Sequence, residues 1–174
     1  MHSTLQRPTR GRFKVPTLLP ALGGTGLLGL WLGARVDGYG LLQTSLGLPL
    51  AVLFSALIMA PALYIGAAVV RAAPSPGAVL QGLARGLDDA GLALLGLLPA
   101  VMFLGATAKN EGVVIFVGLT ALGGALLFGT RLLFGRVFPT PEARLRVLPV
   151  FGAWVVVSMG IGLMMLSRVL GEIA

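Results

Sequence analysis

The chain contains no cysteine and only one histidine, His2, among its 174 residues. Without cysteine it can form neither disulfides nor thiolate metal sites, and it offers no cysteine nucleophile. A single histidine near the start of the chain supplies neither a multi-histidine metal site nor a histidine base within a folded domain. A phosphate-binding G-x-x-x-x-G-K-[ST] loop is missing as well. We therefore predict that the chain is not an enzyme and takes no cofactor or metal.

Charge is also scarce, whereas apolar residues are abundant. Charged residues make up 11% of the chain, hydrophobic residues make up 56%, and the mean hydropathy is +0.95. A soluble domain of this length could not bury so much apolar surface, but a lipid bilayer can cover it. The composition predicts an all-α fold, namely a polytopic integral membrane helical bundle.

Five apolar stretches predict the transmembrane helices. They cover residues 16–34, 49–70, 90–108, 113–130 and 148–166, and each is near the roughly 20 residues that span a bilayer. We expect a single domain over 16–174, preceded by a basic cytoplasmic arm over 1–15. The first stretch has an alternative interpretation as a cleavable signal peptide, which would leave four spans.

The segment between the second and third stretches predicts a further helix. Ser75 and Pro76 suit an N-cap and a first helical position, and leucines then recur at helical spacing through residue 88. We expect an amphipathic helix over 76–88 that lies on the membrane face. Pro49 is expected in the first turn of its span. Pro61 and Pro99 fall within spans, where they either kink a helix supported by its neighbours or expose carbonyls to a transported substrate.

The net charge of +7 has two readings, nucleic-acid binding and membrane topology. The basic residues stand at the ends of apolar stretches, which favours topology and predicts no nucleic-acid partner. With the N-terminus inside and five spans, ten basic residues face the cytoplasm and three face outward. The basic residues of the arm are either plain topology determinants or contacts to lipid headgroups; they are Arg7, Arg10, Arg12 and Lys14. The richness in arginine, alanine, glycine and leucine is typical of a GC-rich bacterial genome, so we expect the cytoplasmic (inner) membrane.

Small residues recur at four-residue spacing within the predicted spans. Such faces let helix backbones approach closely where lipid removes the hydrophobic driving force. They serve either an oligomer or partner interface, or packing within the chain. The candidate helix-packing residues are Gly29, Gly33, Ala121, Ala125, Gly129, Ser158 and Gly162.

Acidic residues are few, and none falls at the middle of a predicted span. Asp88 and Asp89 precede the third span and Glu111 precedes the fourth, where acids complement a helix N-terminus. A membrane enzyme would instead have to use Asp88, Asp89 and Glu142 on the cytoplasmic side. We predict capping.

A family resemblance lies in residues 76–136. PGAVLQGLARGLDDAGLALLGLLP resembles the amphipathic segment and proline-containing span of the Yip1-like membrane proteins, and the helix pair that ends in LLFGTRLLFGR resembles their next spans. That family has a five-span plan. The resemblance implies a membrane-organising or trafficking-related role and supplies no catalytic residue.

The sequence thus predicts a non-enzymatic structural or accessory subunit of a membrane complex. Its expected partners are the lipid bilayer and either another membrane protein or further copies of the chain. A small oligomeric permease or channel is the alternative, because the two prolines within spans could open a path.

Overall fold

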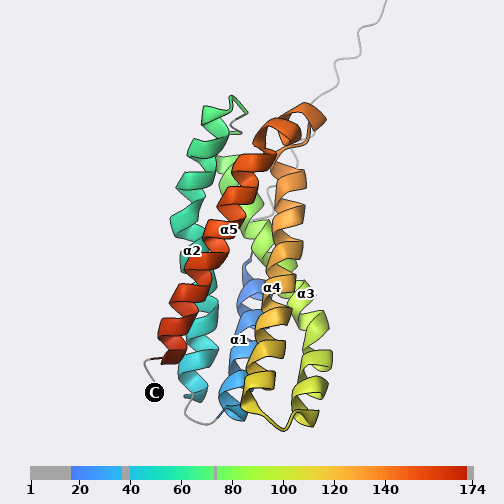
Figure 1. Cartoon of the computed structure of the whole chain (residues 1–174). Helices are drawn as coiled ribbons and strands as arrows, with labels where there is room; N and C mark the ends of the chain where they lie inside the picture. The colour runs from blue at the N-terminus through green and yellow to red at the C-terminus, as the bar shows by residue number, and fades with distance from the viewer. Residues whose placement is uncertain (1–16, 37–39, 73, 172–174) are drawn as a thin grey trace, which may run out of the picture.

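The computed structural model describes residues 17–36, 40–72 and 74–171, with the backbone alone for 166–171. These residues form five helices and no strand. The helices are α1 (Leu19–Arg35), α2 (Leu41–Val69), α3 (Pro76–Thr107), α4 (Glu111–Val137) and α5 (Pro141–Gly171). Successive helices run in alternating directions and form one bundle (Figure 1). The described part of the chain is therefore all-helical, as the composition predicts.

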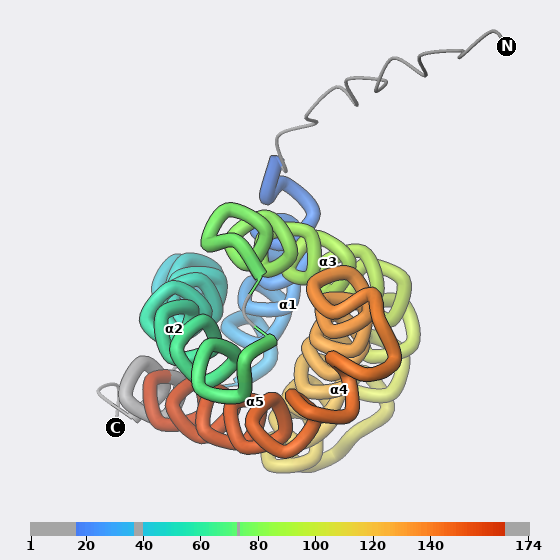
Figure 2. Tube along the Cα trace, turned by 90° about the horizontal axis from the view of Figure 1, so that it is seen from above, coloured from blue at the N-terminus to red at the C-terminus, as the bar shows by residue number. Residues whose placement is uncertain are grey.

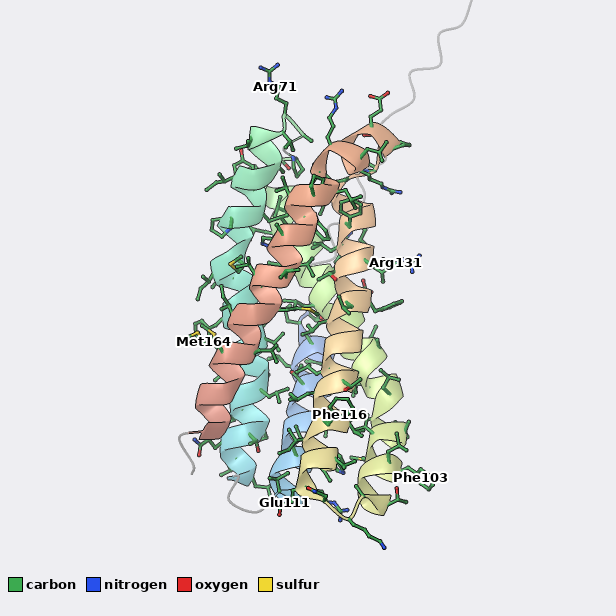
Figure 3. All side chains as sticks on the ribbon, in the orientation of Figure 1. Arg71, Phe103, Glu111, Phe116, Arg131 and Met164 are labelled. Atoms are coloured by element: carbon green, nitrogen blue, oxygen red, sulfur yellow. The ribbon has the colours of Figure 1, made fainter. Side chains whose placement is uncertain are left out.

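Four of these helices, α2 to α5, are long and apolar enough to cross a membrane. Large apolar side chains project from the sides of the bundle, including those of Phe103, Phe116 and Met164, where lipid would cover them (Figure 3). This arrangement is compatible with a multi-pass integral membrane protein. The 17 residues of α1 rise about 26 Å, slightly less than the roughly 30 Å of a hydrocarbon core. A fifth span therefore stays a prediction.

Although α1 is short, it lies at the centre of one half of the bundle. It packs against α2 and α3 and touches α4. Glycines allow these close approaches: a Cβ added at Gly24 would lie 2.6 Å from the carbonyl oxygen of Gly91 in α3. On another face, Gly29 lies against the backbone of Thr44 in α2. Helix α1 is thus held at backbone distance from both neighbours.

Helix α3 joins two segments that the sequence analysis separates. The predicted amphipathic helix 76–88 and the predicted span 90–108 form one continuous helix of 32 residues. Its start is as expected, since the side chain of Ser75 accepts a hydrogen bond of 3.3 Å from the backbone N–H of Ala78. However, Gly82 and Gly86 are buried against Val137 and neighbouring residues of α4. The segment packs on α4 because these glycines bring the two helices together.

Prolines interrupt the hydrogen bonding of three helices from within, at Pro49 and Pro61 in α2, Pro99 in α3 and Pro149 in α5. Helix α2 begins before the predicted span, so Pro49 lies buried inside the helix and not in its first turn. Pro61 and Pro99 also lie inside helices, as expected. Close to Pro61, the carbonyl of Met59 accepts a hydrogen bond from the indole of Trp154 in α5. A neighbouring helix therefore supports α2 beside the proline, as found for kinks in membrane helices.

The buried apolar side chains form two clusters, one in each half of the bundle. The first cluster comes from α1, α2, α3 and α4 and includes Leu28, Leu32, Leu48 and Leu94. The second comes from α2, α3, α4 and α5 and includes Phe138, Phe151 and Trp154. Helix α1 supplies no residue of the second cluster and α5 supplies none of the first. Helix α1 therefore completes the first cluster, and α5 completes the second.

Arginines bind the free carbonyls at two helix C-termini. The Nη2 of Arg35 donates to the carbonyl of Gly105 near the end of α3 at 2.7 Å. The Nε of Arg144 donates to the carbonyl of Phe138 just beyond α4 at 2.7 Å. The last carbonyls of a helix lack partners within the helix and carry partial negative charge, so a guanidinium there stabilises both the end and the contact.

The two aspartates of α3 differ from the expectation that they cap their own helix. Both lie in the middle of α3, because the helix already begins at Pro76. The carboxylate of Asp88 lies near the backbone N–H groups of Leu18 and Ala21 at the start of α1, and its Oδ1 is buried without a hydrogen-bond partner. Asp89 forms a salt bridge with Arg136 of α4. Asp88 thus meets the N-terminus of a different helix. Glu111 does lie in the first turn of α4, as expected.

Candidate functional site: an apolar cavity between α2, α4 and α5

In the described part of the chain, helix α5 packs along α2 and meets α4 only near its own start, where Phe151 lies against the ring of Phe134. It runs along α2, whereas its contacts with α4 are few (Figure 2). The hydrogen bond from Trp154 to Met59 and the apolar cluster around it hold α5 to α2. Further along α5, the side chains that point toward α4 do not reach it. The two helices consequently leave a cavity between them.

The cavity has a volume of about 270 Å³ and is partly open to the surroundings. Its walls come from α2, α4 and α5, with two leucines of α3 at one end. On α4 the lining residues recur at three- and four-residue spacing along one face, from Leu119 to Thr130. On α5 they run from Trp154 to Leu163. The cavity is therefore elongated and parallel to the helices that border it.

The walls are chiefly leucine, alanine and valine, and most of their few hydroxyl groups already donate hydrogen bonds to backbone carbonyls. The Oγ of Ser55 donates to the carbonyl of Val52 at 3.0 Å, and the Oγ1 of Thr130 donates to that of Leu127 at 2.9 Å. The Oγ of Ser158 is buried without a hydrogen-bond partner. A polar solute would lose hydration here and could gain a hydrogen bond only from Ser158, so the cavity suits a largely apolar occupant.

The structure brings two of the predicted packing residues to this cavity. Ser158 and Gly162 belong to its α5 wall, and a Cβ added at Gly162 would lie 3.8 Å from the Oγ of Ser55. Two other predicted residues, Gly29 and Gly33, lie elsewhere, against the start of α2 around Thr44. The predicted residues of α1 and α5 thus serve separate parts of the bundle.

The predicted small face of α4 lies against α3 and the core. Gly129 packs on the backbone of Gly86, and a Cβ there would also meet Ala90 at 2.8 Å. Ala125 is fully buried in the first apolar cluster, and Ala121 is half-buried against it. Within the described chain, these residues make intramolecular contacts. The basic residues predicted to contact lipid headgroups lie outside the described residues; they are Arg7, Arg10, Arg12 and Lys14.

The acidic residues do not assemble into a site. Asp88 and Asp89 lie where α3 meets α1 and α4, and Glu142 lies in the first turn of α5. Among the residues that the structure describes, no three His, Cys, Asp or Glu side chains gather closely enough to hold a metal ion.

Sequence reasoning did not identify the cavity as a site. Its lining residues follow the same helical spacing as residues of the packed core, and they are the same residue types. One local signal exists: Gly123 faces the cavity, and a Cβ added there would meet no atom within 4 Å. A glycine that packs against nothing marks open space, but this becomes visible only once the neighbouring helices are placed.

Comparison with known proteins leaves the family open: no family model, no curated protein and no solved structure matches the chain.

Proposed function

We propose that this chain is an accessory subunit of a membrane complex, without catalytic activity of its own, and that it binds its partner through the outer face of α5. The observation that carries this proposal is how little of α5 the chain itself covers. In the most apolar stretch of α5, 17% of the residues are buried, compared with 44% in α2. A spanning helix with so much free surface can accept a second helix without any change in its own bundle.

The outer face of α5 also has the shape that a second helix needs. Gly152 and Gly160 are exposed, and a Cβ added at either would meet no atom within 4 Å. Val156 stands between them at four-residue spacing and is 71% exposed. Small residues on a helix let another backbone come close, which strengthens packing and weak hydrogen bonds in lipid. Gly29 and Gly129, in contrast, already pack against other helices of the same chain.

The charges support an orientation in the cytoplasmic membrane. Arg71 projects from one end of the bundle, and Glu111 lies at the opposite end (Figure 3). Arginines near the first end come from α3, α4 and α5, while Arg35 and Lys109 lie at the second. By the positive-inside rule the first end faces the cytoplasm. Helix α1 starts toward that end and α5 finishes away from it, which supports an N-terminus inside and a C-terminus outside.

Kinship with the Yip1-like proteins remains part of the proposal. The membrane-organising or trafficking-related role that it implies agrees with a subunit that acts by helix packing and not by chemistry.

Purification from the native host in mild detergent, followed by mass spectrometry, tests the proposal. We expect a partner in near-equal amount with the natural chain and at least a tenfold loss of it with the double variant Gly152→Ile, Gly160→Ile. The matched control is Gly96→Ile in α3, where a side chain also meets open space. It should retain the partner. A natural chain that is stable, monodisperse and without a partner would contradict the proposal.

A small oligomeric permease or channel is the second candidate, and the cavity beside the proline-containing α2 favours it. Purified protein in liposomes should then release ions or small solutes faster than protein-free vesicles do. Equal release from both would argue against transport of the solutes tested.

A further inference from the structure

We propose that the cavity between α2, α4 and α5 is a binding site for one acyl chain of an anionic phospholipid, whose phosphate lies at the arginine-rich ends of α4 and α5. This inference concerns a different surface from the outer face of α5. It therefore stands or falls independently of the proposed partner.

The location of the cavity determines which molecules can reach it. It lies between two helices that are apolar enough to span a membrane and that contact each other little. Leu163 belongs to its wall and is also 58% exposed on the side of the bundle. The cavity therefore communicates with the hydrocarbon region of the bilayer, where lipid chains are the surrounding solvent.

The size of the cavity fits a lipid chain. From Leu119 to Thr130 the α4 wall rises about 16 Å, close to half of a hydrocarbon core of about 30 Å. The cavity offers about 270 Å³. An apolar cavity of about 150 Å³ stays dry and binds benzene, so by proportion this one holds about ten carbon atoms in a row.

The chemistry of the walls agrees with an acyl chain. The hydroxyl groups of Ser55 and Thr130 already donate to carbonyls of their own helices, and leucines, valines and alanines form most of the remaining surface. Water would find few partners among these groups and would not fill the space favourably. An alkyl chain from the adjacent leaflet fits these apolar walls and leaves unpaired only the Ser158 hydroxyl, which already lacks a partner.

The charges beyond the cavity favour an anionic headgroup. Arg131 directly follows Thr130 on α4, and Arg146 lies near the start of α5. Among the described residues, neither arginine has an ion-pair partner, whereas Arg136 pairs with Asp89. Figure 3 shows Arg131 extending outward from α4, on the side away from α5. Guanidinium groups bind phosphate well, and basic residues at the membrane surface attract anionic lipid.

Two adjacent glycines allow a matched test of this site. Gly123 lines the cavity and Gly124 faces outward, and a Cβ added at either meets no atom within 4 Å. Gly123→Phe should fill the cavity, whereas Gly124→Phe places the same ring in the surrounding lipid. Gly162→Leu fills the cavity from the α5 wall and provides a second filling variant, should the first fail to fold.

Native mass spectrometry of the full chain, extracted in mild detergent, reads out the bound lipid. The natural chain and Gly124→Phe should each retain about one phospholipid per chain, enriched in anionic headgroups over the host membrane. Both filling variants should lower the retained lipid at least fivefold while keeping the helical circular-dichroism spectrum. Lipid retained equally by all variants, no lipid on the natural chain, or a polypeptide in its place would overturn the proposal.

Trp154 lines the cavity and offers a second readout once the other tryptophan, Trp31, is replaced by phenylalanine. In nanodiscs made with an anionic phospholipid brominated along its acyl chain, quenching of tryptophan fluorescence should fall at least twofold in Gly123→Phe and stay unchanged in Gly124→Phe. Nanodiscs of a brominated zwitterionic lipid should quench the Trp31→Phe chain less. Equal quenching by both lipids would overturn the anionic preference.

Discussion

The indole Nε1–H of Trp154 in α5 donates a hydrogen bond of 2.6 Å to the backbone carbonyl of Met59 in α2, and both residues are more than nine-tenths buried. Trp154 also packs on the ring of Phe151, with the ring centroids 5.5 Å apart. Its position fixes α5 to α2 above the cavity and so determines how far α5 stands from α4.

Trp154→Phe should loosen this attachment. The variant keeps an aromatic ring but removes the N–H, and a buried hydrogen bond of this kind contributes about 1 kcal/mol. Thermal unfolding in detergent, followed by circular dichroism, should show Tm lower by about 2–4 °C. An unchanged Tm would mean that the indole N–H makes no net contribution to holding α5.

The contact between α3 and α4 should be intolerant of a single methyl group. Gly129→Ala places a Cβ against the backbone of Gly86, so the two helices must separate. Gly124→Ala on the same helix meets open space and should be neutral or slightly stabilising, because alanine is the better helix former by about 1 kcal/mol. Tm measured side by side should fall for the first variant alone. Equal behaviour would show that the helices are not in backbone contact.

The end of α2 should gain stability from a glycine. Arg71 has a φ of 55°, in the left-handed region, and follows α2 at the position where glycine is usual. Its N–H binds the carbonyl of Ala68 at 3.0 Å, and the next N–H binds that of Ala67. Arg71→Gly should therefore raise the free energy of unfolding by about 1 kcal/mol.

The matched control for that variant is Arg85→Gly, which replaces an exposed arginine inside α3. Glycine in the middle of a helix costs about 1 kcal/mol, so this variant should be destabilised. Denaturant or thermal titrations of both variants should give shifts of opposite sign. A loss of stability in both would show that the backbone at position 71 does not favour glycine.

Replacement of Asp88 should lower Tm more than replacement of the neighbouring Asp89 does. Asp88→Ala removes the carboxylate that lies at the N-terminus of α1, where the helix dipole favours a negative charge although desolvation of the buried Oδ1 offsets part of that gain. Asp89→Ala breaks a salt bridge whose side chains are 22% and 41% exposed. A pair with that exposure contributes about 1 kcal/mol or less. If Asp89→Ala lowers Tm more than Asp88→Ala does, the assigned role of Asp88 is wrong.

The sequence predicts the helical architecture well because apolar length and charge placement are local properties. The start of α3 at Ser75 and Pro76 and the acidic first turn of α4 at Glu111 follow from residues next to each other in the chain. The start of α2 does not follow so simply. A proline fits the first helical turn, yet Pro49 lies well inside α2, where tertiary packing offsets its missing hydrogen bond.

The contacts between helices could not be predicted in the same way. Gly82 and Gly86 lower the intrinsic helix stability of the predicted surface helix, yet they are the residues that let α3 approach α4. The role of Asp88 depends on α1, which lies far from it in sequence. The cavity has no signature of its own either. The cavity forms because α5 packs along α2 and diverges from α4. No local residue pattern encodes that divergence.

Site-specific photocrosslinking in native membranes tests the central claim most directly. A photoreactive residue at position 156, on the outer face of α5, should form one defined adduct with a partner protein. The same residue at position 92, on the exposed face of α3, should crosslink to lipid alone. A defined adduct at 156 and none at 92 is the result we predict. Lipid adducts at both positions, or the same protein adduct from both, would contradict the assignment of α5 as the docking helix.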